Sequence, residues 1–207
     1  MLHKKEKPHL LIAYKLCCIC RFKNAPGNFI NSFALSACLL SACQFVFSKR
    51  KYVVGCTNLM TGGPSKGDGC FLRVYYPSQI KDVYEHSSRW ASWLLHPKYV
   101  EDYTIVLGMI PFFGKKLISW AFGNSYIPIA LDAELCNEQR FPVIVFSHGL
   151  TACRTAYSTF CSDISSHGFI VAAIEHRDGS ACMTYSLETE QNSKGGLVES
   201  WIPGNDL

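Results

Sequence analysis

The chain has 207 residues, of which 48% are hydrophobic and 17% charged, and its formal net charge is +4. This length is enough for one domain with a real core, and the composition excludes an intrinsically disordered protein. Lys and Arg are scattered apart from the N-terminal tip and the run Lys49-Arg50-Lys51. Without a basic face that carries interleaved aromatic residues, no nucleic-acid partner is expected.

Eleven cysteines are present, an odd number with no spacing that suggests a disulfide framework. We therefore expect mostly small buried or free thiols, which favours a reducing compartment. The cluster Cys17-Cys18-Ile19-Cys20 contains one C-x-x-C pair, but no second pair follows at zinc-finger spacing. A structural zinc site and acylation of these thiols are the alternatives for this cluster, and no metal is predicted.

Residues 1–51 differ from the rest and are interpreted as an atypical N-terminal extension. Their apolar segment, residues 33–47, has 15 residues. A transmembrane helix needs about 20. The segment resembles the apolar region of a signal peptide or signal anchor, although it begins far into the chain. It favours membrane association or secretion, whereas the missing disulfide framework favours the cytoplasm, so both alternatives stay open.

From residue 52 onward the pattern is that of an α/β protein. Residues 52–57 and 71–76 predict two strands around a Gly-rich loop, and hence a hairpin. The loop contains Gly63-Pro64-Ser65-Lys66-Gly67, which matches the G-x-S-x-G nucleophile elbow. That elbow lies between a buried strand and a helix, whereas here a strand follows. A solvated hairpin loop is therefore favoured over a catalytic Ser65.

Residues 87–123 are rich in Trp and Leu and predict helices. In the segment 112–122, positions 113, 117, 120 and 121 share one helical face, and Lys115 and Lys116 lie off it. Such a helix either packs on the sheet or lies in a lipid surface, with its aromatic residues in the bilayer and its lysines at the headgroups.

The segment 142–174 predicts a β-α-β unit. The apolar run 142–146 is typical of a parallel strand buried on both faces. A helix is expected over 155–167, ended by Gly168, and a second strand over 169–174. Ligands bind at the carboxyl ends of such strands.

Polar segments follow both strands, Ser147 to Thr151 and Glu175 to Asp178. The Leu150 N–H is a candidate oxyanion donor, with Gly149 allowing a tight turn and His148 shaping the loop without transferring a proton. An apolar strand followed by a polar loop also occurs in any Rossmann-like protein.

Two other candidate nucleophiles are weaker. Ser147 and His148 are neighbours at a strand end and should point to opposite faces. Cys153 lies near the turn.

The segment FPVIVFSHGLTACRTAYSTFCSDISSHGFIVAAIEHRDGSACMTY, together with VGCTNLM, FLRVYYPSQ and ESWIP, resembles the platelet-activating factor acetylhydrolase family of lipoprotein-associated or intracellular serine phospholipases. The resemblance covers residues 53–203, and nothing before Tyr52 matches. It implies an α/β-hydrolase fold and the hydrolysis, without calcium or another cofactor, of short or oxidised sn-2 acyl chains of phospholipids such as 1-alkyl-2-acetylglycerophosphocholine.

In that chemistry a Ser attacks the ester, a His takes its proton, an Asp orients the His, and two backbone amides hold the oxyanion. Applied to this sequence, the resemblance implies that the Leu150 N–H is one of those two amides. The resemblance also implies that the helix after the first hairpin docks on lipid surfaces. Its candidate contact residues are Phe112, Phe113, Leu117, Trp120 and Ala121.

The family's Gly-His-Ser-Phe-Gly elbow lies beyond its Trp-Ile-Pro motif, so the resemblance implies that the nucleophile, Asp and His are not in this chain. Residues 52–207 are then the N-terminal part of a hydrolase domain, truncated after the first β-α-β unit and inactive alone. Strand 169–174 would form an exposed edge, and we expect poor autonomous stability. The alternatives are a non-catalytic lipid-surface protein and a partner that pairs with a full-length homologue.

Overall fold

The computed structural model describes residues 50–61, 69–123, 125–137, 139–150, 152–189 and 197–204. The apolar segment 33–47, the cluster Cys17 to Cys20 and the loop with Ser65 lie outside these residues, and so do the expectations placed on them.

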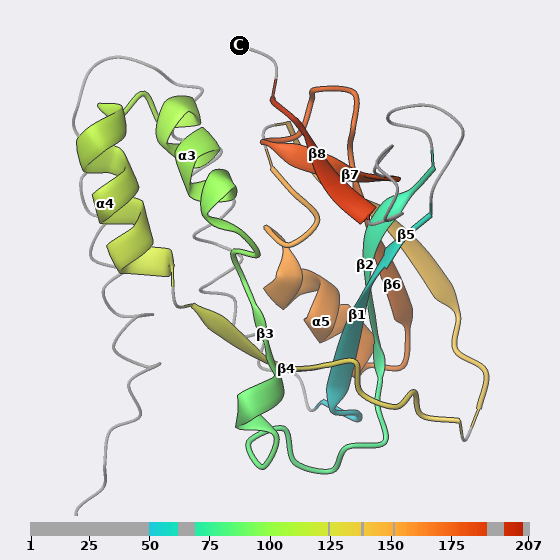
Figure 1. The fold of residues 1–207 in the computed structure, drawn as a ribbon. Coiled ribbons are helices and arrows are strands. Elements are labelled where there is room, and N and C mark those ends of the chain that lie inside the picture. Colours follow the sequence, from blue (N-terminus) through green and yellow to red (C-terminus); the bar gives the residue numbers. More distant parts are fainter. Residues whose placement is uncertain are drawn as a thin grey trace, which may run out of the picture.

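One mixed sheet organises the protein (Figure 1). Its strand order is β3-β4-β1-β2-β6-β5, and a separate antiparallel hairpin, β7 and β8, lies at one end. The strands are β1 (Val54–Met60), β2 (Phe71–Pro77), β3 (Trp90–Ser92), β4 (Tyr126–Leu131), β5 (Val143–Ser147), β6 (Ile170–Glu175), β7 (Thr184–Thr189) and β8 (Leu197–Ile202).

Both units predicted from the sequence are present. Strands β1 and β2 form the expected antiparallel hairpin. Strands β5 and β6 are parallel and are joined through α5 (Ser158–Ser166). The helix is shorter than predicted because residues 154–157 form turns. Gly168 follows it with φ +99, a left-handed conformation that suits glycine. The α/β class is confirmed.

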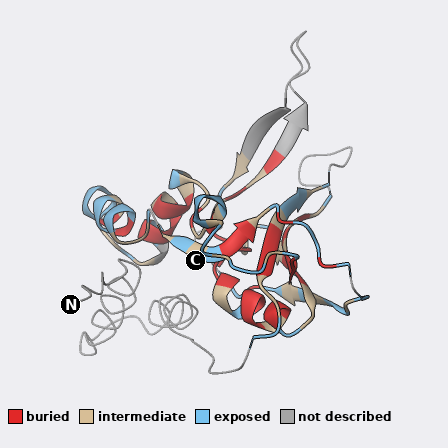
Figure 2. Ribbon diagram, turned by 90° about the horizontal axis from the view of Figure 1, so that it is seen from below, coloured by how far each residue is buried: buried red, intermediate tan, exposed pale blue. Residues whose placement is uncertain are grey.

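Helix α5 covers one face of the sheet and forms the main core there. Tyr75, Val171 and Cys161 are fully buried beneath it, and the Tyr75 hydroxyl hydrogen-bonds the Ser158 hydroxyl at 2.7 Å. Figure 2 shows this buried centre in red. The six cysteines of the described residues are free thiols, as expected, and most are buried: Cys56, Cys70, Cys136, Cys153, Cys161 and Cys182.

Two expectations about the edge of the sheet are wrong. Strand β6 lies between β2 and β5, so β5 forms the edge. Nor is β5 buried on both faces: Ile144 and Phe146 pack on the core, but Val143 and Val145 are each 65% exposed. A run of Val and Ile cannot by itself distinguish a central strand from an edge strand, because the distinction depends on the neighbouring elements.

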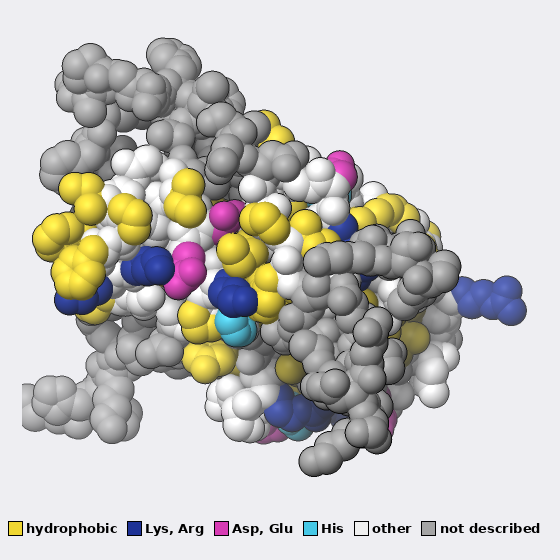
Figure 3. All heavy atoms as spheres, turned by 45° about the horizontal axis from the view of Figure 1, so that its top comes forward, with side chains coloured by type: hydrophobic (Ala, Val, Ile, Leu, Met, Phe, Trp, Pro, Cys, Tyr) yellow, Lys and Arg dark blue, Asp and Glu magenta, His cyan; other side chains and the backbone are white. Residues whose placement is uncertain are grey.

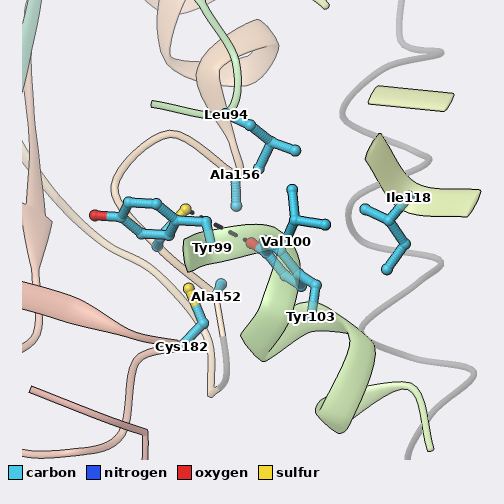
Figure 4. Packing of buried hydrophobic residues seen from close by; sticks show 9 residues of the cluster. Leu94, Tyr99, Val100, Tyr103, Ile118, Ala152, Ala156 and Cys182 are labelled. Atoms are coloured by element: carbon cyan, nitrogen blue, oxygen red, sulfur yellow. Dashed lines mark hydrogen bonds between the residues drawn. The ribbon is translucent and has the colours of Figure 1, made fainter. Parts of the chain in front are cut away.

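Helices α3 (Pro97–Val106) and α4 (Pro111–Phe122) pack side by side as an antiparallel pair next to the sheet (Figure 1). A short 3-10 turn, η1 (Ser87–Arg89), precedes β3. Each helix has a Pro in its first turn, where the missing N–H costs no intrahelical bond. In Figure 4, Tyr99, Val100 and Tyr103 of α3 converge with Ala152, Ala156 and Cys182 in a second core.

Helix α4 packs on α3 through Gly114 and Ile118, so the interpretation that it packs on the sheet is wrong. The face that carries Phe113, Leu117 and Trp120 is exposed. Among the described residues, no helix is both long enough and apolar enough to cross a membrane.

Candidate active site

The polar segments after β5 and β6 lie side by side, as predicted. The parallel register pairs Ser147 with Ile174, so both strands end at the same edge of the sheet. Residues two apart on a strand point to the same face. Ser147 and His176, two residues beyond Ile174, therefore point to the same face and meet.

His148 holds the two segments together as a neutral ring. It is buried, its Nδ1 lies 2.9 Å from the Gly149 carbonyl oxygen, and its Nε2 accepts the His176 backbone N–H at 3.3 Å. Nδ1 therefore carries the proton and donates it to the carbonyl. Burial lowers the pKa of His148 below its ordinary value of 6.5. These contacts hold the loop after β5 against the segment after β6.

Ser147 belongs to a chain of hydrogen bonds that sequence reasoning missed. Its exposed hydroxyl lies 2.8 Å from His176 Nε2, and His176 Nδ1 lies 2.9 Å from the Ser180 hydroxyl. Ser180 in turn donates its O–H to Asp178 Oδ1 at 2.6 Å. From the sequence alone, the partner considered for Ser147 is its neighbour His148. The register of the two predicted strands, extended by two residues, could have indicated His176.

Leu150 lies at the surface three residues after Ser147 and is 58% exposed. None of the hydrogen bonds found among the described residues uses its backbone N–H. Gly149 does not have the left-handed conformation. An added Cβ there would touch only the Tyr157 hydroxyl, at an ordinary contact distance of 3.4 Å.

A buried ion pair lies behind the site. The Arg154 guanidinium contacts Glu175 Oε2 at 3.2 Å, and both side chains are almost fully buried. Glu175 also accepts the Arg154 backbone N–H at 2.7 Å and the Tyr99 hydroxyl at 3.1 Å. The guanidinium stacks 3.6 Å from the centre of the Phe71 ring. These contacts tie the loop after β5 to the end of β6 and to α3.

Cys153, the other candidate nucleophile, is buried and does not face solvent. Its thiol contacts the Tyr103 hydroxyl and Thr155 Oγ1, and a hydrogen bond from Cys182 lowers its pKa. The described His, Cys, Asp and Glu side chains form no cluster suited to a metal ion.

Comparisons with known proteins agree with the family resemblance. Residues 40–207 match the family model described as platelet-activating factor acetylhydrolase, isoform II. The match begins inside the apolar segment 33–47, so the expectation that nothing before Tyr52 matches is wrong.

Curated relatives cover most of this chain. The platelet-activating factor acetylhydrolase of Canis lupus familiaris is 44% identical over 72% of this chain and 32% of its own length. The platelet-activating factor acetylhydrolase of Cavia porcellus is 40% identical over 73% of this chain and 33% of its own length. A putative phospholipase A2 of Schizosaccharomyces pombe is 48% identical over 23% of this chain and 11% of its own length. The chain therefore spans about a third of the length of the two acetylhydrolases.

A solved ferulic acid esterase from Streptomyces cinnamoneus has a TM-score of 0.44 and 16% identity over 72% of this chain and 38% of its own.

Proposed function

Because this chain belongs to the platelet-activating factor acetylhydrolase, isoform II, family, we propose that it supplies the oxyanion part of a calcium-independent phospholipid esterase. The substrates are phospholipids with short or oxidised sn-2 acyl chains, including 1-alkyl-2-acetylglycerophosphocholine. The observation that supports the proposal is the position of Leu150, whose N–H follows β5 at the carboxyl edge of the parallel strands β5 and β6.

In this proposal the residues of the chain bind and stabilise charge. The Leu150 N–H donates to the oxygen that becomes negative when the ester carbonyl is attacked. His148 transfers no proton, because its Nδ1–H is held by Gly149 and its Nε2 accepts the His176 N–H. In this proposal the nucleophile, its base and the orienting Asp are supplied by the part of the family's sequence that follows the Trp-Ile-Pro motif.

The test is a chimera in which this chain replaces the matched third of the Canis lupus familiaris relative. Leu150→Pro removes the N–H, whereas Leu150→Ala keeps it and serves as the matched control. Loss of one oxyanion donor lowers kcat by about 10² to 10³. We expect this loss for Leu150→Pro only, with 1-alkyl-2-acetylglycerophosphocholine as substrate and no effect of a calcium chelator. Equal activity of the two variants would refute the role of Leu150.

We further propose that α4 docks on a phospholipid surface, the role implied for Phe112, Phe113, Leu117, Trp120 and Ala121. Four of these side chains are 50% to 70% exposed, and Ala121 is half-buried. Figure 3 shows hydrophobic side chains gathered on the part of the surface formed by α4, next to basic ones. The Lys116 ammonium lies 4.2 Å from the centre of the Phe112 ring, near the edge of this patch.

A non-catalytic lipid-surface protein is the second candidate function, because this patch does not depend on the active site. The test is co-sedimentation of the chain with phosphatidylcholine vesicles. Burying one large apolar side chain contributes about 1.5 to 3 kcal/mol, so Trp120→Asp should weaken binding by about tenfold or more. Ser88→Asp, an equal charge at an exposed site on η1, should not. Binding by a chain that never hydrolyses lipid, even in the chimera, would favour this function. A chain indifferent to vesicles would eliminate it.

A further inference from the structure

Ser147 has the surroundings of an activated nucleophile, independently of the proposed function. It is exposed at the end of β5, and its hydroxyl lies 2.8 Å from His176 Nε2. A serine hydroxyl is a weak nucleophile unless a neighbouring base accepts its proton, and a histidine at hydrogen-bond distance is the usual base. His176 can act as this base only if the nitrogen that faces Ser147 carries no proton.

The hydrogen bonds of the loop after β6 determine which nitrogen of His176 carries the proton. The Ser180 O–H donates to Asp178 Oδ1 at 2.6 Å, and the Ser180 N–H donates to the same oxygen at 2.9 Å. Because its own proton is directed to Asp178, the Ser180 oxygen can only accept from His176 Nδ1, which lies 2.9 Å away. Nδ1 therefore carries the proton of a neutral His176. Nε2 is then unprotonated, and the Ser147 O–H donates to it.

The far end of the chain of hydrogen bonds is negatively charged. The two bonds from Ser180 lower the pKa of Asp178, so its carboxylate is ionised at neutral pH. When His176 takes a proton from Ser147, its positive charge is therefore stabilised through Ser180 by Asp178. An Asp that orients and stabilises the imidazolium is the third member of a Ser-His-Asp triad, and here one hydroxyl is inserted between the Asp and the His.

A second ring holds His176 in place. The His148 ring stacks on it with centroids 4.0 Å apart and planes at 30°, and accepts its backbone N–H. Since burial keeps His148 neutral, it neither repels the imidazolium nor competes for the proton. His148, in the loop after β5, thus holds the base His176 in place, and the nucleophile Ser147 lies at the end of β5.

We propose that Ser147 is a nucleophile, activated by His176, that accepts an acyl or phosphonyl group from a small activated electrophile. With an aryl ester of a short carboxylic acid, the Ser147 oxygen bonds to the carbonyl carbon and its proton passes to His176 Nε2. The aryl–oxygen leaving group then departs and takes that proton, so acyl-Ser147 and a phenol are formed. Water, deprotonated by His176, hydrolyses the acyl-serine and restores both residues. Ser180 and Asp178 are positioning residues.

The experiment is covalent labelling of the 207-residue chain with a fluorescent fluorophosphonate, in which the Ser147 oxygen replaces fluoride on phosphorus. We expect stoichiometric labelling that peptide mass spectrometry places on Ser147 and that Ser147→Ala abolishes. General-base catalysis contributes about 10² to 10⁴ in rate, so His176→Gln should slow labelling by at least about 10². Ser88→Ala, which removes another exposed serine, should label like the parent chain.

A conservative rescue separates positioning from mere structural support. Ser180→Ala should slow labelling and Ser180→Thr should restore it, because threonine keeps the hydroxyl between His176 and Asp178. Circular dichroism and thermal unfolding of each variant show that it is folded. An unlabelled folded chain, a label on a residue other than Ser147, or full-rate labelling of His176→Gln would overturn the proposal. None of these outcomes bears on the chimera, which tests the Leu150 N–H with a different nucleophile.

Discussion

At the residue scale, the buried pair of Arg154 and Glu175 joins the loop after β5 to the end of β6. Arg154→Met would leave the Glu175 carboxylate buried with its charge unbalanced. Breaking a buried ion pair by removing one partner costs about 3 to 5 kcal/mol. We expect a loss of this size in the free energy of unfolding, measured by urea denaturation. Arg154→Met combined with Glu175→Gln should lose much less. Equal losses in the single and double variants would show that packing, not charge, dominates.

His148 makes stability depend on pH. Burial lowers its pKa in the folded state below 6.5, so the unfolded chain binds a proton more readily. His176, Glu175 and Asp178 also act on its charge, and burial is the largest influence. The free energy of unfolding should therefore be highest above pH 6.5 and should fall as the pH drops from 6.5 toward the folded-state pKa. Urea denaturation at about ten pH values, from about 8 to about 5, measures how the free energy of unfolding changes with pH. His148→Gln should flatten it, and an unchanged slope would assign it to other groups.

At the element scale, the contact between α3 and α4 depends on Gly114. An added Cβ would collide with Thr104 Cγ2 and lie 2.9 Å from Met109 Cβ. Overpacking costs about 1 to 3 kcal/mol, whereas replacing a helical Gly by Ala gains about 1 kcal/mol. Gly114→Ala should therefore give a net loss of stability and faster amide exchange in α4. Ser119→Ala, at an exposed position of the same helix, should not. Greater stability of Gly114→Ala would mean that α4 moves freely on α3.

The sequence was most informative where the structure depends on short segments. The run 142–146 and the segment 169–174 predicted two parallel strands, and the polar ends of such strands must meet, as they do. The contact of Ser147 with His176 was missed because it depends on the register of the two strands, which pairs Ser147 with Ile174, and on the direction of each side chain.

The surroundings of an element could not be predicted in the same way. The apolar face of α4 was recognised, but amphipathicity does not identify the partner of the other face, and Ile118 packs on α3 rather than on the sheet. The exposure of Val143 and Val145 depends on what covers β5, which no property of the strand itself encodes.

At the scale of the whole molecule, β5 is an edge strand whose second face is exposed. Val143 and Val145 are each 65% exposed, and β5 pairs only with β6 among the described strands. An exposed apolar edge strand is a template for pairing with another chain. The two acetylhydrolases that this chain matches are about twice its length, since the matched 151 residues are 33% of the Cavia porcellus relative, and this leaves room in them for a segment that covers this edge.

We therefore predict that this chain associates through β5 with a second copy of itself or with a relative. Val143→Lys combined with Val145→Lys adds charges that disfavour strand pairing, so sedimentation velocity should show a shift toward monomer. Leu59→Lys, a charge at a half-exposed position of β1, should leave association unchanged. The same double variant should no longer co-purify with the Canis lupus familiaris relative. Association that survives both lysines would place the contact on another surface, with the exposed face of α4 the next to be charged.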